Sequence, residues 1–203
     1  MKFRCKPIYE KVSYSEAPKQ TQLIYDDICL SLNIENKERI PNWASYVGGS
    51  PEVLSNTWQL IKAGVINNPL SPIMKELIMV AIATLSRSPY CQTVHSYNAI
   101  KLTNLTYAEL KEIIEGTSQA LLPDAYYAAV QAAKDFCQSD CLHNEEVVAR
   151  LQESGFEESD IAHLIHLVTV SVFVSNFTRI MNLPIEEGIE AHVDKSEQKF
   201  FCF

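Results

Sequence analysis

Three Ser-Pro pairs within about forty residues constrain the fold of this chain more than any other feature. They are Ser50-Pro51, Ser71-Pro72 and Ser88-Pro89, and each stands just before a segment with helical spacing of apolar residues. Serine caps a helix by accepting from a backbone N–H, and proline fits the first turn, where its missing N–H costs nothing. Only six glycines and few alternating runs accompany them, so the 203-residue chain is predicted to be all-α.

The apolar periodicity predicts nine helices, at residues 20–33, 41–48, 51–63, 72–86, 89–102, 106–115, 123–138, 143–153 and 158–181. Thr106 and Glu109 fit a capping box, in which each side chain satisfies a backbone N–H of the other residue. Gly64 and Gly116 stand where the end of a helix needs a left-handed residue.

A single helical domain is expected over residues 20–182, because no long linker or low-complexity tract divides the chain. Residues 1–19 are predicted to form an N-terminal arm. Residues 183–203 form a C-terminal extension, and its Phe200, Phe201 and Phe203 are candidates for packing on a neighbouring subunit.

Composition excludes several kinds of partner. The chain has 17 basic and 25 acidic side chains and no run of Lys and Arg, so nucleic acid is not expected to bind. No signal peptide is recognised, and the apolar stretch 161–177 is judged too short for a membrane span. We therefore expect a cytoplasmic protein with reduced thiols. No glycine-rich phosphate loop is present, and no cofactor is expected.

The informative segment contains Cys91 and His95, which are four residues apart and would share one helix face about 6 Å apart. If Ser88 caps this helix, Cys91 lies in the first turn, where the helix dipole favours a thiolate. His95 could then move a proton to or from the thiol. Glu76 on the preceding helix reaches His95 if the two helices fold back on each other, and could orient the ring.

The same residues also have structural interpretations. An isolated cysteine such as Cys91 is usually a small buried apolar residue, Glu76 could be an ordinary acid in a first helical turn, and Ser88 needs no role beyond capping. Spacing alone leaves both interpretations open.

Other cysteines and histidines are expected to be structural. Cys137 and Cys141, with His143 close by, lack a fourth ligand and are interpreted as thiols near a helix end, although either could resolve an oxidised Cys91. His163 and His166 are interpreted as core or interface residues. No metal site is predicted.

Glu76, eleven intervening residues and then Ser88-x-x-Cys91-x-x-x-His95 resemble the site of the carboxymuconolactone decarboxylase/alkylhydroperoxidase D-like superfamily. The flanking segments 51–58, 75–78, 105–109 and 155–176 are also similar, so the resemblance covers about residues 22–182. It implies an all-helical subunit that assembles into trimers or hexamers.

The peroxidase branch of that superfamily has the pattern Cys-x-x-Cys-x-x-x-His. The resemblance implies that Cys91 is the peroxidatic thiol, that His95 accepts its proton and that Glu76 completes the relay. Ser88 occupies the position of the first cysteine, and a hydroxyl cannot form the disulfide of the usual cycle. Tyr90 is expected to line the core or the pocket, and Asn176 lies on a helix that lines the active-site region in the family.

Three functions follow from the resemblance. In the first, Cys91 reduces a hydroperoxide, and an unidentified thiol or another cysteine restores it. In the second, His95 and Glu76 serve as general acid and base in lactone or keto-acid chemistry, as in the decarboxylase branch. In the third, the chain is an inactive helical homo-oligomer. The best-supported prediction is the first.

Overall fold

The computed structural model describes residues 6–138 and 143–190, and over these residues it contains helices and no strand. The predicted all-α class is confirmed. The elements are α1 (Lys19–Ser31), η1 (Lys37–Arg39), α2 (Asn42–Ser45), α3 (Pro51–Ile61), η2 (Lys62–Ile66), α4 (Pro72–Leu85), α5 (Pro89–Thr103), α6 (Tyr107–Glu115), α7 (Asp124–Gln138), α8 (Asn144–Glu153), α9 (Glu158–Ile180) and α10 (Glu187–Glu190). Each of the nine predicted helices is present, with ends that differ by no more than three residues.

Helix boundaries follow the capping chemistry at most predicted positions. The side chains of Ser71 and Ser88 accept from backbone N–H groups of α4 and α5, and Thr106 and Glu109 form the predicted capping box. Gly116 ends α6 in the left-handed region, with φ of 79°. Ser50 is the exception, because its side chain makes no capping hydrogen bond.

The prediction for Gly64 is wrong. Helix α3 does not end there but continues as the π-helical turn η2, and the φ angle of Gly64 is not positive. Glycine is required by packing instead, because a Cβ atom at this position would lie 2.5 Å from Cγ2 of Val170 on α9. The absence of a side chain thus lets η2 approach α9 closely.

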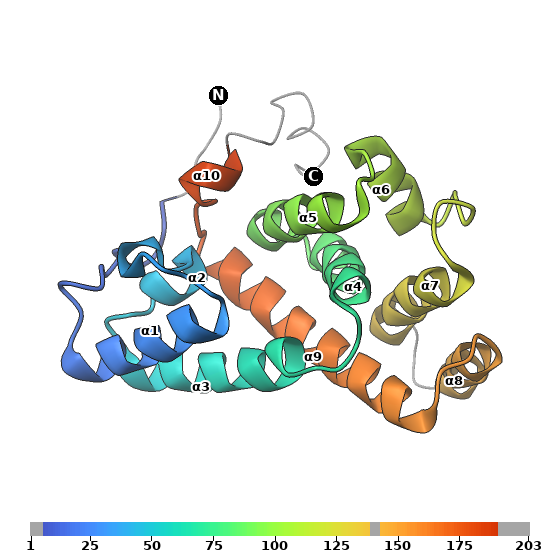
Figure 1. The fold of residues 1–203 in the computed structure, drawn as a ribbon, viewed down its shortest axis with the longest axis horizontal. Coiled ribbons are helices and arrows are strands. Elements are labelled where there is room, and N and C mark those ends of the chain that lie inside the picture. Colours follow the sequence, from blue (N-terminus) through green and yellow to red (C-terminus); the bar gives the residue numbers. More distant parts are fainter. Residues whose placement is uncertain (1–5, 139–142, 191–203) are drawn as a thin grey trace.

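Helix α4 runs through the middle of the molecule, between α5, α7 and α9 (Figure 1). Its residues from Leu77 to Ala83 are all buried. Different faces of α4 contribute to three apolar clusters, shared with α1, α3 and the C-terminal end of α9, with α7, α8 and α9, and with α5, α6 and α7. The backbone of α4 is therefore held by packing against helices on several sides.

The N-terminal arm lies against the helical domain. The N–H of Ile8 donates to the carbonyl of Met181 at 3.2 Å, and the N–H of Val12 donates to that of Ser45 at 2.9 Å. Ala17 is buried and belongs to the core. Phe200, Phe201 and Phe203, on which the expectation for the C-terminal extension depends, lie outside the described residues.

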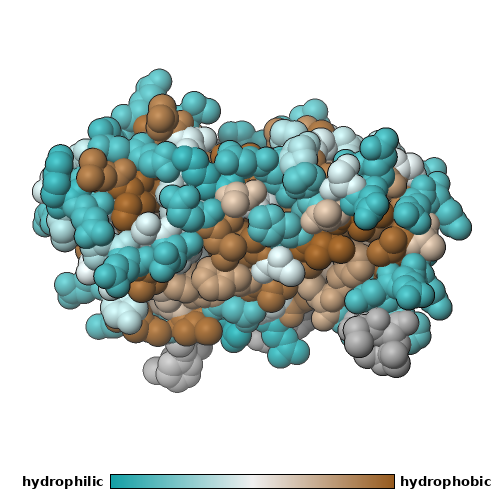
Figure 2. All heavy atoms as spheres, turned by 90° about the horizontal axis from the view of Figure 1, so that it is seen from below, coloured by the Kyte–Doolittle hydropathy of each residue, from teal (hydrophilic) through white to brown (hydrophobic). Residues whose placement is uncertain are grey.

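Helix α9 is the longest helix among the described residues and crosses the molecule beneath α4 and α5 (Figure 1). It is long and apolar enough by composition to cross a membrane, contrary to the expectation from the sequence, although 44% of its most apolar window is buried inside the fold. His163 and His166 lie on its exposed side rather than in the core. Seen from below, apolar side chains form a broken strip across the face where α3 and α9 run (Figure 2).

Candidate active site

The turn between α4 and α5 determines the geometry of the site. The N–H of Ser88 donates to the carbonyl of Ala83 at 3.0 Å, and that of Arg87 donates to the carbonyl of Thr84 at 3.1 Å. This is the Schellman pattern, and it places Arg87 in the left-handed region with φ of 51°. Because the reversal is so tight, α5 packs along α4 and brings residues of the two helices face to face.

Glu76 on α4 and His95 on α5 are paired. Oε2 of Glu76 lies 2.8 Å from Nδ1 of His95, and Oε1 accepts from Nδ2 of Asn98 at 3.3 Å. The His95 side chain is 21% exposed and that of Glu76 is 17% exposed, so solvent reaches the pair, although most of its surface contacts protein. Since Nδ1 faces the carboxylate, Nε2 is the ring atom left to interact with Cys91.

Cys91 lies in the first turn of α5 and is only 3% exposed. Its Sγ atom is 3.2 Å from Oγ1 of Thr178, which comes from the last turn of α9. Its backbone N–H donates to Oγ of Ser88 at 3.4 Å. The oxygens of Ser88 and Thr178 are themselves 3.0 Å apart, so two buried hydroxyl groups adjoin the thiol.

The electrostatic environment favours a charged pair of Cys91 and His95. Burial acts to raise the pKa of the Cys91 thiol, but the hydrogen bond and charge of His95, with the hydroxyls of Thr178 and Ser88, outweigh it and leave the pKa below the usual thiol value. Burial acts to lower the pKa of His95, but the charge of Glu76 and the hydrogen bonds to Cys91 and Glu76 raise it to about 10. This arrangement increases the fraction of Cys91 that is a thiolate and keeps the imidazole of His95 protonated beside it.

The side chains of Tyr90 and Asn176 form hydrogen bonds with residues other than Cys91 and His95. Tyr90 is buried, and its hydroxyl donates to Oε1 of Glu186 at 2.5 Å. Asn176 donates from Nδ2 to the carbonyl of Val172 within α9, and its Oδ1 accepts from Arg179. The sequence therefore brings Glu76, Ser88, Cys91 and His95 together, whereas Asn176 serves its own helix.

Sequence reasoning missed Thr178, Asn98 and Glu186. Thr178 is 87 positions from Cys91, and only the packing of α9 on α5 reveals the contact. A signal was nevertheless present, because the apolar helix α9 carries buried hydroxyl side chains at Ser171, Ser175 and Thr178, spaced so that they share one face. Polar groups on the buried face of an apolar helix need partners.

The remaining thiols and acids form no second centre in the described part of the chain. Cys137 is exposed in the last turn of α7, where desolvation raises its pKa, while Cys141 lies outside the described residues. No group of three or more His, Cys, Asp or Glu side chains among the described residues could hold a metal ion.

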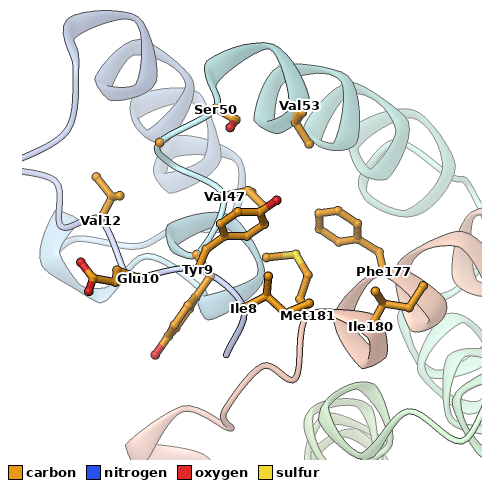
Figure 3. A pocket seen from close by; sticks show the side chains of 12 residues that line it. Ile8, Tyr9, Glu10, Val12, Val47, Ser50, Val53, Phe177, Ile180 and Met181 are labelled. Carbon is orange, nitrogen blue, oxygen red and sulfur yellow. The ribbon is translucent and has the colours of Figure 1, made fainter. Parts of the chain in front are cut away.

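A pocket of about 420 Å³ lies on another face of α9 (Figure 3). Its lining is mostly apolar: Ile8, Tyr9, Glu10, Val12, Tyr46, Val47, Gly49, Ser50, Val53, Phe177, Ile180 and Met181. None of Glu76, Cys91 and His95 lines it, so this cavity and the reactive pair are separate features.

Residues 42–135 match the model of the carboxymuconolactone decarboxylase family. This segment contains Glu76, Ser88, Cys91 and His95 but not Thr178. No curated protein sequence matches the chain.

Solved structures share the whole fold at low sequence identity. The apo debrominase Bmp8 is 16% identical with a TM-score of 0.71, covering 97% of this chain and 99% of its own. A Cys-to-Ala variant of Bmp8 in complex with 2,3,4-tribromopyrrole is 17% identical with a TM-score of 0.72, covering 94% and 97%. An uncharacterised peroxidase-related protein from Silicibacter sp. TM1040 is 15% identical with a TM-score of 0.73, covering 93% and 97%.

Proposed function

We propose that the chain belongs to the carboxymuconolactone decarboxylase/alkylhydroperoxidase D-like superfamily, because residues 42–135 match the model of the decarboxylase family, and that it reduces a hydroperoxide at Cys91 with an external thiol as reductant. The observation that carries the proposal is the array in which the half-buried Glu76 binds His95 and the hydrogen bond and charge of His95 lower the pKa of the buried Cys91. A thiolate is the reactive form of cysteine toward a peroxide oxygen.

In the first step the Cys91 thiolate attacks the terminal oxygen of the hydroperoxide. A sulfur–oxygen bond forms and the oxygen–oxygen bond breaks, so that Cys91 becomes a sulfenic acid and an alkoxide leaves. The His95 imidazolium gives its proton to the alkoxide, which departs as an alcohol. Glu76 holds Nδ1 and keeps Nε2 directed toward the reacting atoms.

In the second step an external thiol restores the site. One thiol molecule condenses with the sulfenic acid, releasing water and leaving a mixed disulfide on Cys91. A second thiol attacks this bond, regenerates the Cys91 thiol and leaves as the oxidised disulfide. Two thiols are oxidised for each hydroperoxide reduced, and Ser88 takes no part in the exchange because its hydroxyl cannot form a disulfide.

The first test is peptide-level mass spectrometry after about one equivalent of hydrogen peroxide with a sulfenate trap present. We expect label at Cys91 ahead of buried Cys29 and exposed Cys137, since desolvation raises the pKa of both other thiols. The comparison with Cys137 separates activation from mere exposure. An unlabelled Cys91 would remove the central residue of the proposal.

Turnover is tested with purified variants, hydrogen peroxide and dithiothreitol. Cys91→Ser should abolish peroxide consumption and His95→Gln should slow it at least tenfold. Cys137→Ser should leave the rate unchanged if the reductant is external. A slowed Cys137→Ser variant, with a Cys91–Cys137 link in a non-reducing peptide map, would instead identify Cys137 as the resolving thiol.

The general acid–base alternative is separated by the same variants. Lactone or keto-acid chemistry at His95 and Glu76 would survive Cys91→Ala and fail in His95→Ala. The peroxidase proposal requires that both substitutions impair turnover. An unreactive Cys91, together with no turnover of either kind of substrate by the wild-type protein, would favour a non-catalytic helical protein.

A further inference from the structure

Two hydroxyl groups and one backbone amide form a closed set of contacts around the Cys91 sulfur. The Cys91 N–H lies 3.4 Å from Oγ of Ser88, that oxygen lies 3.0 Å from Oγ1 of Thr178, and Oγ1 lies 3.2 Å from Sγ of Cys91. Ser88 and Thr178 are both fully buried. No water molecule needs to intervene at these distances.

The direction of these hydrogen bonds depends on whether sulfur carries a proton. A backbone N–H can only donate, so Ser88 accepts from Cys91 and keeps its own proton for Thr178. A thiolate can only accept, so the Thr178 proton then points at Sγ. When Cys91 is a thiol, its S–H can donate to Thr178, and Thr178 donates instead to the carbonyl of Ser175 at 3.2 Å.

We propose that Thr178, oriented by Ser88, is a positioning residue that stabilises the Cys91 thiolate through a hydroxyl relay from the first turn of α5. The inference rests on the proposed use of Cys91 as a nucleophile and adds a residue from outside the family-matched segment 42–135. Each bond in the relay polarises the next, and the last one ends on a charge, where hydrogen bonds are strongest.

The relay also assigns a function to the hydroxyl at position 88. A serine hydroxyl both accepts from the Cys91 amide and donates onward, whereas a thiol is a weak donor and acceptor. Ser88 therefore does more than cap α5. Because it donates its proton to Oγ1 of Thr178, the Thr178 proton is left to point toward Sγ of Cys91. A purely structural role for the two hydroxyls would leave the ionisation of Cys91 unaffected by their removal.

The test measures the rate of Cys91 alkylation by iodoacetamide against pH, with peptide-level mass spectrometry of the full chain. Thr178→Val keeps the shape of the side chain and removes the hydroxyl. It should raise the apparent pKa of Cys91 by about one unit and slow alkylation severalfold below that pKa. Thr178→Ser should restore the wild-type profile.

A matched control is available on the same helix. Ser171 is buried on α9 and its hydroxyl donates to the carbonyl of Leu167 at 2.7 Å, but it has no hydrogen bond to Cys91. Ser171→Ala should leave the alkylation profile of Cys91 unchanged. An unchanged profile in a folded Thr178→Val protein would overturn the proposal.

A second pair of variants keeps the test decisive if Thr178→Val fails to fold. Ser88→Ala should also raise the apparent pKa of Cys91, because Thr178 loses its oriented donor. Ser71→Ala removes the equivalent cap of α4 and should not. A profile that responds equally to both alanine variants, or to neither, refutes the relay.

Alkylation requires no peroxide, so the two proposals fail separately. A shifted profile without peroxide turnover would leave the relay intact and remove the peroxidase. Peroxide turnover by the wild type, together with an unshifted alkylation profile in Thr178→Val, would refute the relay and leave the peroxidase proposal intact.

Discussion

At the scale of single residues, the Glu76–His95 bond determines over which pH range the site is reactive. The carboxylate helps to raise the pKa of His95 to about 10, and the protonated ring helps to lower the pKa of Cys91. The charged pair should therefore persist from the depressed pKa of Cys91 up to about pH 10. Reactivity is lost on the acid side, as the thiolate takes up a proton.

Glu76→Gln should raise the pH below which the reactivity of Cys91 is lost. Without the carboxylate charge, the pKa of His95 falls toward its ordinary value and that of Cys91 rises, by about one unit. The rate of peroxide reduction measured from pH 5 to 9 should consequently drop severalfold near neutrality. Glu112→Gln makes the same charge change at an exposed position and should leave the profile in place.

Ser88→Cys should convert the site to a dithiol. Residues three apart at the start of a helix lie about 5–6 Å from each other, within the range that a disulfide bridges. Peroxide should then produce an intramolecular disulfide between positions 88 and 91, detected in a peptide map without reductant. Ser86→Cys, two residues earlier on the turn, is the control and should not link to Cys91.

At the scale of helices and segments, most of the architecture was predictable from local chemistry. Ser71, Ser88 and the Thr106–Glu109 box mark helix starts because capping involves residues close in sequence. The pairing of Glu76 with His95 followed from one assumption, that α4 and α5 reverse tightly. Residues whose roles arise from packing between distant helices, such as Gly64 and Thr178, could not be assigned in this way.

Gly64→Ala tests the close approach of η2 to α9. The added Cβ would lie 2.5 Å from Cγ2 of Val170, so the variant should lower the free energy of unfolding by about 1–3 kcal/mol. Val170→Ala should recover part of that loss when combined with it, because the two changes share one contact. Gly49→Ala, which meets no atom within 4 Å, is the control in urea unfolding.

The segment after α9 is held by Glu186. Its Oε1 accepts from the hydroxyl of Tyr90 at 2.5 Å and from the N–H of Asn42 at 3.0 Å, which joins this segment to α5 and α2. Oε2 of Glu186 is buried without a partner among the described residues. Nδ2 of Asn42 also donates to the carbonyl of Pro184 at 2.9 Å, so Asn42 and Glu186 together attach the segment.

Tyr90→Phe should loosen this segment. Removing a hydrogen bond to a partly buried carboxylate should lower the free energy of unfolding by about 1–3 kcal/mol and increase amide exchange over residues 183–190. Tyr9→Phe changes an exposed tyrosine and should have no effect on either measurement. Unaltered exchange in Tyr90→Phe would contradict the role given to Glu186.

At the scale of the whole molecule, helix α9 exposes large apolar side chains that no other part of the described chain covers. Ile165, Phe173 and Ile180 are large apolar side chains of this helix that are between 40% and 60% exposed. Exposed apolar surface of this kind marks interaction sites. We propose that α9 contributes to the interface of a homo-oligomer.

Phe173→Glu should therefore reduce the size of the assembly. The new charge would be buried without a partner between subunits, which strongly disfavours association. Light scattering coupled to size-exclusion chromatography should show a smaller species than the wild type. Gln152→Glu, on the exposed side of α8, should elute as the wild type does, and a wild type that is already monomeric would contradict the proposal.

The serine at position 88 also determines which molecules supply the electrons for catalysis. Among the described residues the site contains one sulfur, that of Cys91, so the site can be oxidised only once before a thiol from outside it must reduce Cys91. Each turnover would then draw directly on thiols dissolved around the protein. At low thiol concentration the rate of peroxide removal should rise in proportion to that concentration. The peroxidase activity would then depend on how much reduced thiol the surrounding solution contains.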